Sequence, residues 1–305
     1  MTVQVFTSAN LAYLPQATIL ANSVRRHAPG VHFVLVLVDD LPEAGSDLER
    51  RVGPDVFDEV ITAAELLGDD VDDWIFGYDV IEACTAIKGR ALVHLLDRGE
   101  PVIYLDPDTV LFGSLDSFID DVRAASIVLT PHQMDPVEID EPGVDDEICT
   151  LAHGIYNFGV FGVNPNDEGR RFARWWASRL DVFCVDDLPR GLFVDQRWGD
   201  LVPSFFPGAV IHRDAGMNVA TWNLHQRHLT VDAIGDYAVN GEPLVLYHFT
   251  KAQGIGFEVA KLRMLSNPLA ADLWRWYLER LEQESVEGVP SWAFARYRTG
   301  APIAP

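Results

Sequence analysis

The stretch Pro101-Val-Ile-Tyr-Leu-Asp106-Pro-Asp108-Thr-Val-Leu-Phe112 decides how the rest of the sequence is interpreted. It begins with an apolar run that is typical of a strand buried on both faces of a parallel sheet. The run leads directly into Asp106 and Asp108, so two carboxylates follow the carboxyl end of a strand. Ligands of open α/β sheets bind at that edge. The stretch therefore predicts an α/β protein with a ligand site beside these two acids.

Asp106 and Asp108 suit a divalent cation. Two carboxylates at i and i+2, stiffened by Pro107, can share one ion, and Mg²⁺ is usually held by one or two carboxylates plus substrate phosphates. A solvated turn is the alternative, since acidic turns are common in an acidic chain. The apolar runs on both sides favour a metal, because ionised carboxylates near a core need a partner.

The segments before this stretch predict a β-α-β start. Residues 3–7 and 32–38 have the composition of strands, and residues 14–27 between them place apolar side chains on one helical face. Two capping boxes mark further helices: they are Thr62 with Glu65, and Asp79 with Glu82. The second box opens a long helix that leads to the central stretch.

After the central stretch, strands and amphipathic helices continue to alternate. The strands are expected at residues 127–130, 158–163 and 244–249, and the helices at residues 168–180 and 270–284. The acid- and proline-rich segment up to about Thr150 is expected to be a surface loop.

No repeat or linker divides the chain. We expect one α/β domain, residues 1–255, with a mixed and mostly parallel sheet flanked by helices, followed by a C-terminal helical extension and tail, residues 256–305. The aromatic and arginine residues of the last helix could form a dimer or membrane-edge contact, with packing on the domain as the default.

The composition argues against a protein whose main activity is binding to nucleic acid or to anionic membranes. The 305 residues carry a formal net charge of -23, which repels nucleic acid and anionic membranes. The first residues lack the features of a signal peptide, and no apolar run is long enough to span a bilayer, so we expect a cytoplasmic protein. Cys84, Cys149 and Cys184 have neither zinc nor disulfide spacing and are expected to be buried apolar residues.

The sequence lacks the short motifs of several common enzyme classes. The sequence has no P-loop, no dinucleotide fingerprint, no zinc-binding helix and no nucleophile elbow. Hydrolysis by paired carboxylates stays open.

Seven short motifs, in order, resemble those of GT-A-fold glycosyltransferases, in particular the family 8-like bacterial enzymes that use nucleotide sugars. The resemblance covers about residues 3 to 255, and its specificity lies in the joint order of the motifs. They are Phe6-Thr-Ser-Ala-Asn10, Thr85-Ala-Ile-Lys88, Tyr104-Leu-Asp-Pro-Asp108, Tyr156-Asn-Phe-Gly-Val160, Asp195-Gln196, Gly216-Met-Asn-Val-Ala-Thr-Trp-Asn-Leu224 and His248-Phe249. The resemblance implies a Rossmann-like GT-A sheet.

The resemblance also implies which residues bind the metal ion and the donor. Asp106, Asp108 and His248 would hold Mn²⁺ or Mg²⁺, and mixed oxygen and nitrogen ligation suits Mn²⁺. Contacts with the donor are implied for Thr7, Asn10, Asp39, Lys88, Asp106 and Lys251. Taken alone, Thr7 and Asn10 could belong to a polar turn, and Asp39 could equally be a helix cap. Lys88 and Lys251 could be solvated, although the scarcity of lysine and the buried stripe beside Lys88 favour a functional role for it.

Around the reacting sugar the resemblance implies catalytic roles for Asn157, Asp195 and Gln196. Asp195 would bind sugar hydroxyls, and Gln196 would lie on the face opposite the leaving group. An amide is a poor nucleophile, so stabilisation of an ion pair is favoured over a covalent intermediate. Acceptor contacts are expected from Asn218, Trp222 and Asn223, whose amide and ring chemistry suits sugars.

The expected function is metal-dependent transfer of a sugar from a nucleotide-sugar donor, a UDP-sugar, to a hydroxyl of a glycan, lipid or small molecule. Retention of configuration is implied by the resemblance alone. A sugar nucleotidyltransferase is the alternative enzyme, although it would need a Gly-rich basic loop after the first strand. A non-catalytic carbohydrate-binding protein of the same fold, and a homodimer, also stay open.

Overall fold

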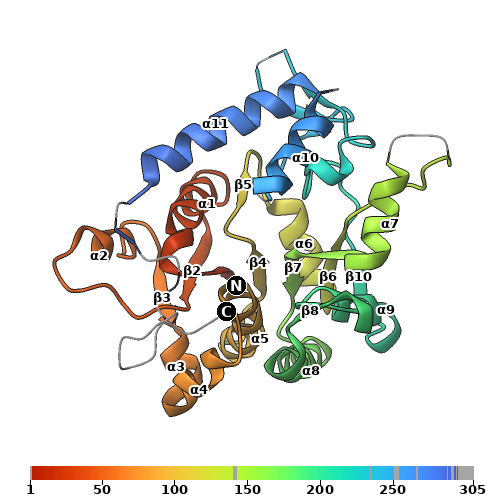
Figure 1. Ribbon diagram of the computed structural model, residues 1–305. Helices are drawn as coiled ribbons and strands as arrows, with labels where there is room; N and C mark the ends of the chain where they lie inside the picture. The colour runs from red at the N-terminus through yellow and green to blue at the C-terminus, as the bar shows by residue number, and fades with distance from the viewer. Residues whose placement is uncertain are drawn as a thin grey trace.

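The computed structural model describes residues 2–139, 143–233, 235–250, 254–265, 267–286, 288–289, 292 and 294. Its centre is a seven-stranded sheet in the order β10-β6-β7-β4-β1-β2-β3 (Figure 1). The strands are β1 (Val3–Ala9), β2 (Val31–Leu37), β3 (Glu59–Thr62), β4 (Val102–Leu105), β6 (Ile127–Pro131), β7 (Tyr156–Val163) and β10 (Ala209–Ile211). Only β7 is antiparallel to its neighbours, β4 and β6, so the expected mixed and mostly parallel sheet is confirmed.

Helices cover both faces of the sheet. α5 (Val80–Leu96) and α8 (Asp167–Phe183) pack together on one face, and α1 (Leu14–His27) and α6 (Asp116–Ala124) pack on the other. Gly89 of α5 lets the helix pair approach closely, because a Cβ at this position would lie 2.6 Å from Ala177 Cα. The result is a three-layer arrangement with an apolar core on each side of the sheet.

Both predicted capping boxes are present. Thr62 and Glu65 exchange side-chain and backbone hydrogen bonds at the start of α3 (Ala63–Leu67). Asp79 and Glu82 do the same at the start of α5. These local signals are visible in the sequence because donor and acceptor lie three residues apart.

The acid-rich segment before Thr150 is only partly a loop. It contains α7 (Val144–His153), whose first turn carries Asp145, Asp146 and Glu147, where negative charge stabilises the helix N-terminus. Cys149 is exposed on this helix, so the expectation of a buried cysteine is wrong there. Cys184 is buried as expected, and Cys84 is half-buried.

The remaining described elements lie between the strands of the central sheet or in the C-terminal region. They are η1 (Leu11–Tyr13), α2 (Asp47–Arg51), η2 (Gly68–Asp70), α4 (Val71–Phe76), β5 (Thr109–Leu111), β8 (Asp186–Asp187), η3 (Leu188–Arg190), β9 (Leu192–Phe193), η4 (Arg197–Leu201), α9 (Val202–Phe205), η5 (Thr221–Asn223), β11 (Leu229–Val231), β12 (Tyr237–Val239), β13 (Glu242–Pro243), β14 (Leu246–His248), α10 (Gly254–Met264) and α11 (Pro268–Glu284).

The C-terminal helix α11 packs on the domain. It lies beside α1 (Figure 1) and encloses a third apolar cluster. Trp274 Nε1 donates to the Tyr247 hydroxyl at 3.2 Å, and the Tyr277 ring stacks on Phe249 with centroids 4.1 Å apart. These aromatic side chains are therefore core residues, as the default interpretation expects. Within the described residues, no helix is long and apolar enough to cross a membrane.

Candidate metal centre

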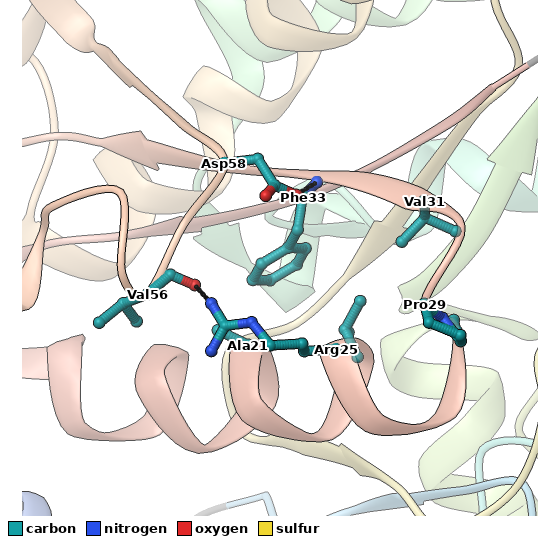
Figure 2. A pocket seen from close by; sticks show the side chains of 9 residues that line it. Ala21, Arg25, Pro29, Val31, Phe33, Val56 and Asp58 are labelled. Atoms are coloured by element: carbon teal, nitrogen blue, oxygen red, sulfur yellow. Dashed lines mark hydrogen bonds between the residues drawn. The ribbon is translucent and has the colours of Figure 1, made fainter.

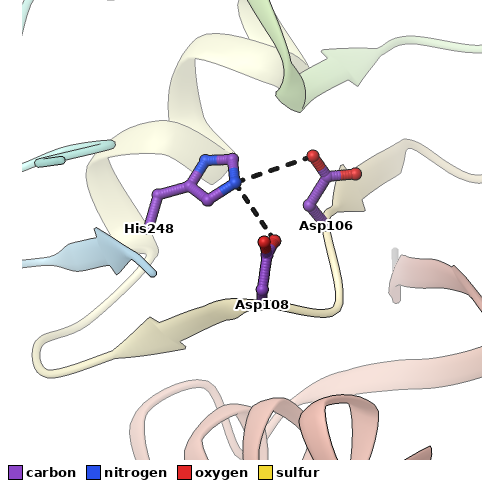
Figure 3. Close-up of side chains that lie close together, drawn as sticks. All are labelled: Asp106, Asp108 and His248. Atoms are coloured by element: carbon purple, nitrogen blue, oxygen red, sulfur yellow. Dashed lines mark ion pairs between the residues drawn. The ribbon is translucent and has the colours of Figure 1, made fainter. Parts of the chain in front are cut away.

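Two antiparallel strands bring the three expected metal ligands together. Asp106 and Asp108 lie in the turn between β4 and β5, and β14 pairs with β5 so that His248 lies opposite Thr109. His248 Nε2 lies 3.1 Å from Asp108 Oδ1 and 3.8 Å from Asp106 Oδ2 (Figure 3). One ligand atom from each residue lies within 4.8 Å of the others, so the three can share one ion.

The donor set fits a divalent cation. Two carboxylate oxygens and one imidazole nitrogen are suitable ligands for Mn²⁺ and Mg²⁺, and adjacent ligands at about 2.1 Å from an ion lie about 3 Å apart. Gly159 on β7 leaves room for this cluster. A Cβ at position 159 would lie 2.4 Å from Asp106 Oδ2 and 2.7 Å from His248 Cε1, so a larger residue would displace the ligands.

Asp106 is oriented by its neighbours. Its Oδ1 accepts hydrogen bonds from the Tyr104 hydroxyl at 2.7 Å and from Lys88 Nζ at 3.1 Å, which leaves Oδ2 facing His248. The Ser8 hydroxyl, which donates to the Cys84 carbonyl at 2.7 Å, lies 3.1 Å from the Tyr104 hydroxyl. Burial opposes ionisation of Asp106, but Lys88 and His248 outweigh it and lower the pKa of Asp106.

Lys88 is shared by two carboxylates. Besides Asp106, its Nζ lies 3.0 Å from Asp195 Oδ2, and it lies over the Tyr104 ring at 4.2 Å. Burial raises the pKa of Asp195 to about 6, although Lys88 opposes the shift. Together with Asp108, these acids bring more negative charge than Lys88 offsets. The site therefore favours a further cation.

Asn157 and Gln196 form a buried amide network beside the carboxylates. Gln196 Oε1 accepts from Asn157 Nδ2 and from the Phe158 N–H, both at 3.2 Å, and Gln196 Nε2 donates to the His153 carbonyl at 3.0 Å. Asn218 Nδ2 in turn donates to Asn157 Oδ1 at 3.0 Å. The Gln196 amide is thus held on both sides by protein groups.

The expected donor-binding residues at the end of β1 lie in different positions. Thr7 is fully buried on the face of β1 that packs on α1, whereas Ser8 faces the Tyr104 side. Asn10 is buried at the start of η1. Lys251 lies outside the described residues. Ser8 contacts Tyr104, which bonds to Asp106, and the donor contacts expected for Thr7, Asn10 and Lys251 stay predictions.

Asp39 bonds to the backbone at the start of η1, whereas the three expected acceptor residues lie around His248. Asp39 Oδ2 accepts the Leu11 N–H at 2.7 Å, as a cap would. Asn218 and Asn223 are fully buried behind His248, and the Trp222 ring packs edge-on against the His248 ring with centroids 5.1 Å apart. The structure therefore surrounds the histidine with these residues, and their contact with an acceptor stays a prediction.

The sequence interpretation missed Tyr104, Ser8, Gly159 and His132. Tyr104 lies two residues before Asp106, so strand alternation could have placed both on one face. His132 Nε2 lies 3.2 Å from Asn157 Nδ2, and burial lowers the pKa of His132 to about 4. No spacing in the sequence links it to Asn157, because the two residues come from neighbouring strands.

A separate hollow of about 110 Å³ lies between α1 and the first residues of β2 (Figure 2). Pro29, Phe33 and Val56 line it, together with Arg25, whose Nη2 donates to the Val56 carbonyl at 2.9 Å. It adjoins the amino end of β2, whereas the carboxylates lie beyond the carboxyl end of β4, so it is distinct from the candidate metal centre.

Sequence comparison gives a distant relative. No protein-family profile matches the chain. The protein YfnD of Bacillus subtilis (strain 168), which is described as uncharacterized, is 25% identical over 174 residues. The match covers 55% of this chain and 53% of YfnD, so it spans about half the length of that curated relative.

Two solved structures that are similar to this chain are glycosyltransferases. The galactosyltransferase LgtC, in complex with donor and acceptor sugar analogues, matches with a TM-score of 0.51 and 16% identity over 95% of this chain and 98% of that chain. The apo-form glycosyltransferase GlyE of Streptococcus pneumoniae TIGR4 has a TM-score of 0.48 and 15% identity over 94% of this chain and 64% of that chain. The LgtC match covers nearly the whole chain and bears on the fold. The chain therefore has the GT-A fold found in the galactosyltransferase LgtC.

Proposed function

We propose that the chain is a divalent-metal-dependent glycosyltransferase that moves a sugar from a UDP-sugar to a hydroxyl group of an acceptor, with retention of configuration. The observation that carries the proposal is the grouping of Asp106, Asp108 and His248 at the carboxyl edge of a GT-A sheet. The shared fold with LgtC, a galactosyltransferase, supports sugar transfer as the reaction class.

The charge balance supports a need for metal. A donor diphosphate is an anion, and the chain has a net charge of -23. Within the site, Lys88 is already bonded to Asp106 and Asp195. A divalent ion held by the three ligands would neutralise the diphosphate and stabilise it as the leaving group.

The amide network favours a mechanism without a covalent intermediate on Gln196. Its carboxamide oxygen already accepts two hydrogen bonds, and its nitrogen donates to the His153 carbonyl. An amide is also a poor nucleophile. We assign Gln196 to holding Asn157, and Asp195 to contact with the sugar hydroxyls. In the proposed step the bond between the sugar C1 and the diphosphate oxygen breaks and leaves positive charge on the sugar ring. The acceptor oxygen then bonds to C1 on the same face, and its proton passes to the departing diphosphate.

We further propose that residues 1–255 form the catalytic domain and residues 256–305 an extension. Helix α11 of the extension braces the strand of the metal histidine. Trp274 donates a hydrogen bond to Tyr247, and Tyr277 stacks on Phe249. Tyr247 and Phe249 are the residues before and after His248 in the sequence.

The test is release of UDP from a panel of UDP-sugars with Mn²⁺ or Mg²⁺, which needs no knowledge of the acceptor. We expect turnover of at least one donor, loss of it on chelation, and a fall of at least about 100-fold for Asp108→Asn. Asp120→Asn, a change of an exposed acid on α6, is the matched control and should keep full activity. UDP binding without turnover of any donor, or pyrophosphate formation from UTP and a sugar phosphate, would contradict the proposal.

A further inference from the structure

We propose that Asn218 is the positioning residue of the metal histidine: its carboxamide oxygen holds the Nδ1 proton of His248 and so aims the Nε2 lone pair at the ion. The inference rests on the proposed metal centre. Asn218 Oδ1 lies 3.2 Å from His248 Nδ1, and Asn218 is fully buried. On the other side of the ring, His248 Nε2 faces Asp108 and Asp106.

The orientation of the Asn218 amide follows from a backbone donor. The Gly159 N–H donates to Asn157 Oδ1 at 3.1 Å, which identifies that atom as the oxygen. Asn218 Nδ2 donates to the same oxygen at 3.0 Å and to Thr130 Oγ1 at 3.1 Å. Both hydrogens of the Asn218 amide are therefore used, and its oxygen must face His248.

An oxygen at this position selects one tautomer of the ring. It can only accept, so the neutral imidazole of His248 carries its proton on Nδ1. Nε2 is then the unprotonated nitrogen, which is the form that ligates a metal. Residues that fix a ligating histidine in this way typically change metal affinity by 10- to 100-fold when they are replaced.

The backbone explains why this position is Asn. Asn218 has a φ of 57°, in the left-handed region that Asn and Gly tolerate best. The Asn223 amide donates to the Asn218 carbonyl at 3.1 Å, and the Val219 carbonyl accepts the His248 N–H at 2.7 Å. The turn therefore places the Asn218 carboxamide beside the strand that carries His248.

Asn218→Gly separates the two roles of this residue, because Gly keeps the left-handed backbone and removes the amide. Asn240→Gly is the matched control. Asn240 has a φ of 52°, is exposed, and bonds to the His228 N–H and the Gln226 carbonyl, away from the metal centre. Both variants therefore lose an amide side chain at a residue with left-handed backbone, and they differ in whether that amide contacts His248.

The experiment measures the Kd for Mn²⁺ by electron paramagnetic resonance of the free ion. We expect Asn218→Gly to bind Mn²⁺ about 10- to 100-fold more weakly than the wild type, and Asn240→Gly to stay within about two-fold. If Asn218→Gly keeps the wild-type Kd while Asp108→Asn loses Mn²⁺ binding, the role of Asn218 is overturned and the metal centre stands. An unchanged Kd in Asp108→Asn overturns the metal centre itself.

A second readout uses the wild type and does not depend on how well a variant folds. Imidazole ¹⁵N NMR of the Cd²⁺-loaded protein should show the His248 proton on Nδ1 and the metal on Nε2. A proton on Nε2 overturns the inference.

Discussion

Lys88 and Asp195 form a buried ion pair, with Nζ 3.0 Å from Oδ2 and side chains only 6% and 5% exposed. The pair joins helix α5 to the segment before η4. Because Lys88 also bonds to Asp106, it connects the candidate metal centre to the proposed sugar-binding side of the site.

Replacing Lys88 should destabilise the protein. Lys88→Met leaves Asp106 and Asp195 buried without their cation, and breaking such a pair costs about 3–5 kcal/mol. Urea unfolding at neutral pH measures the loss. Lys261→Met removes an exposed pair with Glu258 and should change stability by less than about 1 kcal/mol. Adding Asp195→Asn to Lys88→Met should restore part of the stability; a Lys88→Met protein as stable as the wild type would refute the coupling.

Replacing Gly159 should impair metal binding. Gly159→Ala puts a Cβ 2.4 Å from Asp106 Oδ2, so the ligand must move. We expect Mn²⁺ affinity to fall by on the order of 10- to 100-fold, measured by equilibrium dialysis. Gly30→Ala is the control, since a Cβ at position 30 meets no atom within 4 Å. Equal Kd values for both variants would argue against a metal at this position.

His132 should make stability depend on pH. Its pKa is lowered from 6.5 to about 4 by burial, so in this range the unfolded chain binds a proton that the folded chain does not. The free energy of unfolding therefore falls as the pH drops from 6.5 towards 4, by about 2 kcal/mol at pH 5 relative to pH 7. Denaturation of His132→Gln over the same range should show a smaller decrease. Parallel curves for the two proteins would assign the acid sensitivity to other groups.

Helix α11 should stabilise β14, the strand that carries His248. Trp274→Ala removes a buried ring and the donor to the Tyr247 hydroxyl, which should cost about 3–5 kcal/mol. Arg275→Ala, next to it on an exposed position, should change stability by no more than about 0.5 kcal/mol. Thermal unfolding compares the two. If Trp274→Ala unfolds at the wild-type temperature, α11 does not brace β14.

Local signals made much of the fold predictable. The buried run before Asp106 predicts β4, and the capping boxes at Thr62 and Asp79 predict the starts of α3 and α5. α7 was missed because prolines and acids dominate its surroundings, although the acids of its first turn fit a helix N-terminus. Such a signal is ambiguous without knowledge of what the helix packs on.

The sequence pattern alone predicted the candidate site only where residues share an edge of the sheet. Asp106 and Asp108 follow a strand, whereas the resemblance supplied His248, Lys88, Asn157, Asp195 and Gln196. The contacts of Lys88 with Asp195 and of Asn218 with His248 join residues that lie far apart in the sequence. The alternation of β1 places Ser8 beside Tyr104, whereas the donor contact expected for Thr7 stays a prediction. These relations depend on how strands and helices pack, which spacing alone does not determine.

The most direct test of the metal-dependent mechanism is the affinity of UDP measured by calorimetry with and without Mn²⁺, in the wild type and in Asp108→Asn. We expect Mn²⁺ to strengthen UDP binding by at least about ten-fold in the wild type, and Asp108→Asn to lose most of this gain. UDP binding of equal strength with and without Mn²⁺ in both proteins would contradict the central claim.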